Sequence, residues 1–211
     1  MKYKGIIFDL DGVICSTDEY HYLAWKSVAD SLNIFFDETV NNRLRGVSRV
    51  ESLEIILENY DIVLSEKEKL VLMEKKNTLY KELLMNMSPE NLSEEVKNTL
   101  DELRQRGYVL AIGSSSKNAR YILDRLGLGT YFDVISDGTN ITYSKPNPEV
   151  FLKAAEQLKL QPQDCLVVED ATAGVEAACR GGFDCAGIGD AAGDGRATYG
   201  LGRFGELLKF L

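Results

Sequence analysis

Four groups of polar side chains stand where short apolar runs of the sequence end, or in the loops just beyond. The groups are Asp9 with Asp11; Ser114 with Ser116, Lys117 and Asn118; Lys145; and Glu169 with Asp170. If the apolar runs are parallel strands, their carboxyl ends share one edge of a sheet and the four groups converge there. Carboxylates, hydroxyls and a lysine at one point are the groups that phosphoryl transfer requires.

Each group suits one part of that chemistry. Asp9 can attack phosphorus as an oxygen nucleophile and form an aspartyl-phosphate. Asp11 lies two residues further on, before a turn at Gly12, where it can act as general acid and base on the leaving or attacking oxygen. Ser114 and Lys145 can hydrogen-bond to the phosphoryl oxygens and neutralise their charge.

A divalent cation is the natural companion of these carboxylates. Asp9, Glu169 and Asp170 would repel one another strongly if nothing positive lay between them. Mg²⁺ binds few carboxylates and completes its coordination with water and substrate oxygens. The sequence therefore predicts a magnesium site at the same sheet edge.

Simpler explanations exist for each group taken alone. Asp-Gly is a common turn dipeptide, and acidic residues such as Glu169 and Asp170 are favoured at helix N-termini. Lys145 before a proline can be an exposed residue at a helix start. A lone histidine such as His21 is usually structural or solvated. The convergence of four groups is what favours catalysis.

The elements expected to position these groups alternate along the chain. Strands are predicted at 4–10, 108–112, 133–135, 165–168 and 184–188. Helices are predicted at 94–106, 118–126, 148–158 and 172–180. This alternation predicts an α/β fold, a Rossmann-like parallel sheet covered by helices on both faces. The glycine-rich stretch 187–205 is predicted to be an irregular loop before a short final helix.

The segment from Asp18 to Met87 breaks the alternation. It has the apolar spacing of consecutive amphipathic helices, for example at Leu53, Ile56, Leu57 and Tyr60. We interpret it as a helical cap inserted after the first strand. The predicted domains are therefore a core of residues 1–15 and 88–211 and a cap of residues 16–87.

Composition restricts the partners. The chain has 211 residues and a formal net charge of −9. This charge argues against nucleic acid as a partner, because nucleic-acid binding needs a basic protein surface. No stretch has the roughly 18 apolar residues of a membrane span. A cytoplasmic protein is therefore expected, and the acidic charge leaves a small phosphorylated substrate open. The four cysteines form no C-x-x-C pair, so we expect reduced thiols. A monomer is expected.

Four ordered motifs also carry a family resemblance. They are F-D-L-D-G-V from Phe8, the serine of G-S-S-S-K-N, the lysine of S-K-P-N-P and V-V-E-D-A-T-A-G from Val167. In this order they resemble the four motifs of haloacid dehalogenase (HAD) superfamily phosphotransferases. The resemblance implies the HAD fold, Asp9 as nucleophile, and Mg²⁺ held by Asp9, the Asp11 main-chain carbonyl, Glu169 and Asp170.

Within that superfamily the chain is similar to the β-phosphoglucomutase subfamily, through E-Y-H-Y-L-A-W, R-G-V-S-R-V-E-S-L, K-K-N and S-K-N. The similarity implies interconversion of β-D-glucose 1-phosphate and glucose 6-phosphate, with glucose 1,6-bisphosphate as phosphoryl donor. Arg49 with Ser116, Lys117 and Asn118 would bind a second phosphate. Thr17, His21 and Lys76 would couple cap closure to Asp11. The implied substrate-binding residues are Asp11, Thr17, His21, Trp25, Gly46, Val47, Arg49, Ser52, Lys76, Ser116, Lys117 and Asn118.

Two other functions remain open on sequence grounds. The same catalytic core could hydrolyse small phosphomonoesters such as sugar phosphates, and the cap sequence around Arg49 is the main reason to favour a mutase. A non-catalytic scaffold is the second alternative, and the intact acidic and lysine positions argue against it. Trp25 fits cap packing better than a sugar platform.

Overall fold

The computed structural model describes residues 2–58, 60–61 and 63–211. In these residues the core is a six-stranded sheet of order β3-β2-β1-β4-β5-β6 in which every neighbouring pair is parallel. The strands are β1 (Gly5–Phe8), β2 (Val109–Gly113), β3 (Val134–Ser136), β4 (Cys165–Glu169), β5 (Asp184–Ile188) and β6 (Tyr199–Leu201). The predicted α/β fold is confirmed.

Alternation along β1 explains how a buried apolar strand serves both faces of the sheet. Ile6 and Phe8 belong to one hydrophobic cluster, whereas Ile7 between them belongs to the other. Side chains of a strand point alternately to opposite faces, and helices cover both faces here. An uninterrupted apolar run is therefore what this position requires.

Two helical layers sandwich the sheet. On one face lie α5 (Glu94–Gln105), α6 (Ala119–Arg125) and the 3₁₀ turn η4 (Phe204–Lys209). On the other face lie α7 (Glu149–Leu158) and α8 (Thr172–Arg180). The predicted helices agree with these bounds to within one residue at each end. Short 3₁₀ turns occur at η1 (Pro89–Asn91), η2 (Pro162–Asp164) and η3 (Gly189–Gly193).

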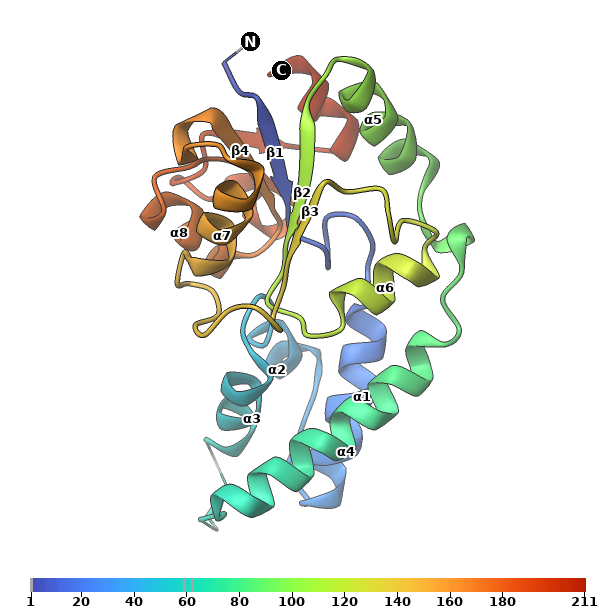
Figure 1. The fold of residues 1–211 in the computed structure, drawn as a ribbon. Helices are drawn as coiled ribbons and strands as arrows, with labels where there is room; N and C mark the ends of the chain where they lie inside the picture. Colours follow the sequence, from blue (N-terminus) through green and yellow to red (C-terminus); the bar gives the residue numbers. More distant parts are fainter. Residues whose placement is uncertain (1, 59, 62) are drawn as a thin grey trace.

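The cap is a helical insertion between β1 and β2, at one end of the molecule (Figure 1). Its helices are α1 (Asp18–Ser31), α2 (Glu38–Asn42), α3 (Arg49–Leu57) and α4 (Glu66–Leu84). Ser48 and Ser65 begin α3 and α4 with capping boxes, in which the serine and a glutamate three residues later satisfy each other's main-chain N–H groups. Trp25, Leu53 and Ile56 are buried in a core of the cap's own.

Cap and core also share apolar contacts. Tyr80, Leu84 and Met87, at the end of α4 and just beyond it, join the same buried cluster as Phe8 and Leu100 of the core. Burial of this surface stabilises the junction by the hydrophobic effect. The predicted domain boundaries at 15/16 and 87/88 stay a prediction, with the end of α4 packed on the core.

The prediction of an irregular loop over 187–205 was wrong in part. This stretch contains η3 and the edge strand β6, which pairs with β5 through Ala186–Tyr199, Gly187–Gly200 and Ile188–Leu201. β6 has only three residues, and one of them is glycine, so it has no apolar run that marks a strand. Its order comes from pairing with β5, which lies more than ten residues earlier.

Candidate active site

The sheet reverses its strand order between β1 and β4, and the candidate site lies at this point. β2 and β3 extend from β1 in one direction, and β5 and β6 extend from β4 in the other. Phe8 is in register with Val168, and the Asp9 main-chain N–H donates to the Val168 carbonyl at 2.9 Å. Asp9 therefore stands beside the end of β4, where Glu169 is the last strand residue and Asp170 follows, as expected for a ligand site in such a sheet.

Lys145 joins the two strand ends. Its ammonium group is fully buried and donates to Asp9 Oδ1 and to Glu169 Oε1. Burial lowers the pKa of Lys145, but the two adjacent carboxylates outweigh burial and raise it above its usual value. Lys145 thus stays charged beside Asp9. Asp9 Oδ2 accepts no hydrogen bond from the described residues, so this oxygen is available for attack.

Glu169 is held from both sides. Its Oε1 accepts from Lys145, and its Oε2 accepts from the Ala171 main-chain N–H at 2.9 Å. Gly174 leaves room for this carboxylate, because a Cβ atom at that position would lie 1.8 Å from Glu169 Oε1. Glu169 therefore fixes Lys145, and its own role as a metal ligand stays a prediction.

The surroundings of Asp170 indicate whether these residues suit Mg²⁺. Its Oδ2 lies against the loop after Asp11, since a Cβ atom on Gly12 would lie 2.0 Å away. Burial, and then the charges of Asp9, Glu169 and Asp11, raise the pKa of Asp170 above its usual value. In the described part of the chain no three His, Cys, Asp or Glu side chains form a metal cage. Mg²⁺ needs only one or two carboxylates, so Asp9, Asp170 and the Asp11 carbonyl fit it.

Asp11 faces the cap. Its Oδ1 accepts the Thr17 main-chain N–H at 2.6 Å, and its Oδ2 accepts the Thr17 hydroxyl at 2.6 Å. That hydroxyl also lies 2.9 Å from the Tyr80 hydroxyl of α4. Burial raises the pKa of Asp11 to about 6, and the bonds from Thr17 act in the opposite direction. A carboxyl group with such a pKa can both donate and accept a proton near neutral pH.

His21 and Lys76 continue this network into the cap. Lys76 is 3% exposed, and its Nζ lies 3.0 Å from His21 Nδ1 and 4.1 Å from the centre of the Tyr80 ring. Burial, followed by the charge of Arg49, lowers the pKa of Lys76 to about 7. Burial, Lys76 and Arg49 lower the pKa of His21. A neutral His21 that accepts from Lys76 at Nδ1 carries its proton on Nε2, 3.6 Å from Asp11 Oδ2.

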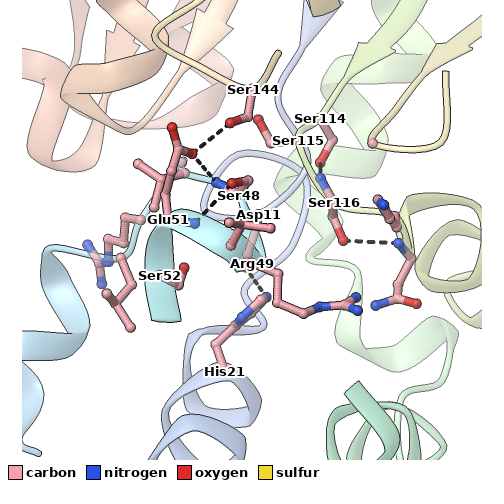
Figure 2. Close-up of a pocket in the computed structure, with 18 of the residues that line it drawn as sticks. Asp11, His21, Ser48, Arg49, Glu51, Ser52, Ser114, Ser115, Ser116 and Ser144 are labelled. Carbon is pink, nitrogen blue, oxygen red and sulfur yellow. Dashed lines mark hydrogen bonds and ion pairs between the residues drawn. The ribbon is translucent and has the colours of Figure 1, made fainter. Parts of the chain in front are cut away.

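A second set of donors lies where the cap meets the loop after β2. Ser114 Oγ accepts the Ser116 N–H, and Ser116 Oγ accepts the Asn118 N–H. Arg49 extends from α3 toward this loop, as Figure 2 shows. Among the described residues neither Arg49 nor Lys76 has a carboxylate within 4.0 Å. Two partly or fully buried cations without an acidic partner favour an anionic ligand.

A cavity of about 900 Å³ between cap and core connects these groups. Most predicted site residues line it: Asp9, Asp11, His21, Trp25, Gly46, Val47, Arg49, Ser52, Lys76, Ser114, Ser116, Lys117, Asn118 and Asp170. Thr17, Lys145 and Glu169 do not line it and are buried directly behind it. Gly46 has a φ of +75°, and a Cβ atom there would lie 3.3 Å from Ala171 Cβ, so the cap loop approaches the core closely.

Besides the contacts of Asp11, three further polar contacts between the side chains of described residues join cap to core. Arg45 Nη1 binds Asp190 Oδ2 at 2.6 Å, the Ser144 hydroxyl donates to Glu51 Oε2 at 2.7 Å, and Asn118 Nδ2 donates to Asn77 Oδ1 at 3.1 Å. The Glu51–Ser144 contact is visible in Figure 2. Of these residues the sequence reasoning assigned only Asn118; it did not assign Arg45, Glu51, Asn77, Ser144, Asp190 or Tyr80. Tyr80 lies one helical turn after Lys76, and that spacing is the only local signal for it.

A model of the haloacid dehalogenase-like hydrolase family matches residues 3–182. The chain therefore belongs to this family, as the four motifs predicted. Phosphotransferases of the family generally use Mg²⁺.

Two relatives are similar over nearly the whole chain. β-Phosphoglucomutase of Bacillus subtilis is 42% identical over 88% of this chain and 83% of that protein. A phosphorylated carbohydrates phosphatase of Thermotoga maritima is 33% identical over 94% of this chain and 91% of that protein.

Among solved structures, the crystal structure of β-phosphoglucomutase from Clostridium difficile superposes with a TM-score of 0.92. It is 35% identical, with 97% of this chain and 93% of that chain covered. The predicted subfamily resemblance is confirmed. Among the described residues, none of the helices combines the length and apolar character needed to cross a membrane.

Proposed function

We propose that this chain is a β-phosphoglucomutase that interconverts β-D-glucose 1-phosphate and glucose 6-phosphate. The observation that supports the proposal is that one cavity is lined by two separate groups of residues suited to bind phosphate. Asp9 and Ser114, with Lys145 buried behind Asp9, form the first set, and Arg49 with the loop 116–118 forms the second. A mutase that works through glucose 1,6-bisphosphate must hold one phosphate while it reacts at the other. A simple phosphatase needs only the first set.

Asp9 and Asp11 divide the reaction between them. Asp9 Oδ2 attacks phosphorus, the bond from phosphorus to the sugar oxygen breaks, and Asp11 supplies a proton to that oxygen. In the return step Asp11 accepts the proton of the other sugar hydroxyl as this hydroxyl attacks the aspartyl-phosphate. Lys145 and Ser114 neutralise the phosphoryl oxygens throughout. Bound Mg²⁺, held by Asp9, Asp170 and the Asp11 carbonyl, would supply further charge neutralisation.

The cap excludes water from this exchange. Hydrolysis of the aspartyl-phosphate would waste the phosphoryl group, so a mutase requires a closed cavity while the sugar reorients. The contacts of Arg45, Glu51 and Asn77 with the core support such a closed state. We expect the protein to act as a cytoplasmic monomer on small phosphosugars, without nucleic-acid or membrane partners.

A product assay tests the proposal. The protein is incubated with Mg²⁺, β-glucose 1-phosphate and a trace of glucose 1,6-bisphosphate, and glucose 6-phosphate and inorganic phosphate are measured. Glucose 6-phosphate as the main product supports the mutase. Inorganic phosphate as the main product favours the sugar phosphate phosphatase, the function of the Thermotoga maritima relative. Asp9→Asn should form neither product, because the nucleophile is lost.

Arg49→Ala separates the two phosphate sets. We expect kcat/KM for isomerisation to fall about 10- to 100-fold, the effect of losing a hydrogen bond to a charged group. Hydrolysis of acetyl phosphate, which needs only the first set, should change less than about twofold by the same reasoning. Arg43→Ala is the matched control, because Arg43 pairs with Glu58 on the outside of the cap. Unchanged isomerisation in Arg49→Ala would refute the second phosphate site.

A further inference from the structure

Asn77 links the cap and core halves of the second phosphate set through a single atom. Its Oδ1 accepts from Arg49 Nη2 at 2.7 Å and from Asn118 Nδ2 at 3.1 Å. Arg49 begins α3 of the cap, Asn118 precedes α6 of the core, and Asn77 lies within α4. Both Arg49 and Asn118 line the cavity, whereas Asn77 lies outside its lining.

Asn118 uses its side-chain N–H for this contact and not for capping its own helix. Asn118 occupies the N-cap position of α6, where an asparagine side chain ordinarily accepts from main-chain N–H groups of the first turn. Here it makes no such capping bond, and it is only 7% exposed. Its side-chain Nδ2 donates across to Asn77 of the cap at 3.1 Å, so this buried amide is oriented by a contact between cap and core and not by its own helix.

A neutral acceptor suits the task of holding Arg49. A carboxylate in this place would bind the guanidinium as a fork and compete with a phosphate for it. The amide oxygen of Asn77 fixes the direction of the guanidinium with one hydrogen bond and leaves its charge and its other N–H groups available. Lys76, the neighbouring residue on α4, turns instead to His21 and the aromatic rings.

We propose that Asn77 is a positioning residue that assembles the second phosphate site from Arg49 and Asn118 when the cap closes. This inference rests on the proposed function and goes beyond it. The Asn118 bond crosses from cap to core, so it exists only in the closed molecule, and the site is complete only then. Opening the cap separates Arg49 from Asn118, which weakens the hold on the second phosphate and favours release.

Binding to the inactive Asp9→Asn protein tests the proposal directly. We expect calorimetry to show tight binding of glucose 1,6-bisphosphate and about tenfold weaker binding when Asn77→Leu is added. Asn77→Asp should weaken binding further, since a carboxylate neutralises Arg49 and repels phosphate. The control Asn86→Asp adds the same charge at an exposed position just beyond α4 and should leave the affinity unchanged.

A double-mutant cycle separates positioning from a general structural role. If Asn77 acts through Arg49, the loss from Asn77→Leu should shrink to less than about threefold in an Arg49→Ala background. The assignment would be overturned if Asn77→Leu weakened bisphosphate binding equally with Arg49 present and in the Arg49→Ala background. It would also be overturned if Asn77→Leu did not weaken binding at all. If bisphosphate does not bind at all, the second phosphate site falls with it. If binding depends on Asn77 but the wild-type protein makes no glucose 6-phosphate, only the mutase assignment fails.

Discussion

The pKa values of two buried lysines are shifted in opposite directions. Lys145 lies between the carboxylates of Asp9 and Glu169 and stays charged. Lys76 lies against His21 and the rings of Trp25 and Tyr80, with Arg49 adding a like charge, and its pKa falls to about 7. Burial alone disfavours the charged form, so the neighbouring charges determine the outcome.

Lys76 should make stability depend on pH in the alkaline range. Its pKa is about 7 in the folded protein and near 10.4 in the unfolded chain, so between these values the unfolded state binds more protons. The contribution of Lys76 to the free energy of unfolding of the wild type therefore rises with pH in this window, by up to about 1.4 kcal/mol per pH unit. Lys76→Met removes this dependence, so the variant should be the more stable by a margin that shrinks from pH 7.5 to pH 9.5.

Urea unfolding at the two pH values measures that margin. Lys75→Met, at the exposed neighbouring position, provides the baseline. A margin of Lys76→Met over the wild type that stays constant across the window would contradict the assignment of a lowered pKa to Lys76.

The convergence of several candidate catalytic residues could be predicted at the residue scale, because strand ends are visible in the sequence. Asp9 and Asp170 each follow an apolar run, and the parallel sheet brings such ends together. The contacts of Asn77 and Tyr80 could not be predicted in this way. They depend on the distance between α4 and distant segments, and no local pattern encodes that distance.

At the scale of elements, the loop between α2 and α3 connects the cap to the core. Arg45 in this loop binds Asp18 at the start of α1 and Asp190 in η3. The first ion pair stays within the cap, but the second crosses to the core. The guanidinium therefore holds the loop that carries Gly46 and Val47 over the cavity.

Asp190→Asn should weaken closure more than folding. The Asp190 carboxylate is largely exposed, so its ion pair contributes only about 0–1 kcal/mol. We expect the ratio of inorganic phosphate to glucose 6-phosphate formed from β-glucose 1-phosphate to rise about two- to fivefold, because water reaches the aspartyl-phosphate more often. Glu58→Gln breaks the exposed pair with Arg43 inside the cap and is the control. Equal product ratios for the two variants would refute the role of Arg45.

Long or fully buried elements could be located from the sequence, whereas the short edge strand β6 could not. β1 and β4 are continuous apolar runs and could be located from sequence, as could the long amphipathic α5. β6 consists of Tyr199, Gly200 and Leu201 and gives no periodic signal of its own. Its pairing partner β5 supplies the order, so only the assembled sheet reveals it.

The whole molecule carries a net charge of −9 and gathers four acidic side chains at one point of the sheet. A bound cation relieves the repulsion between them, so folding and cation binding should be coupled. The cap insertion over this point was predictable from the break in strand and helix alternation. The contacts that close the cap were not predictable, because they join segments that are far apart in the sequence.

Mg²⁺ should therefore stabilise the wild-type protein by about 2.7 kcal/mol at a concentration of 100 times its Kd. Asp170→Asn should be more stable than the wild type in the presence of a chelator, because one charge of the repelling group is gone. Addition of Mg²⁺ should increase the stability of this variant only slightly. Thermal unfolding with and without Mg²⁺, at ionic strength matched with NaCl, measures both effects. If Mg²⁺ stabilises Asp170→Asn as much as it stabilises the wild type, Asp170 is not a ligand of the ion.

Both ends of the chain lie on the side of the molecule away from the cap (Figure 1). Attachment to a solid support at Leu211 would hold the protein at the end opposite the cap. A protein immobilised in this way should leave the cap free to move and allow sugar phosphates to enter the cavity. Attachment through an exposed cap lysine such as Lys75 would restrain the cap itself.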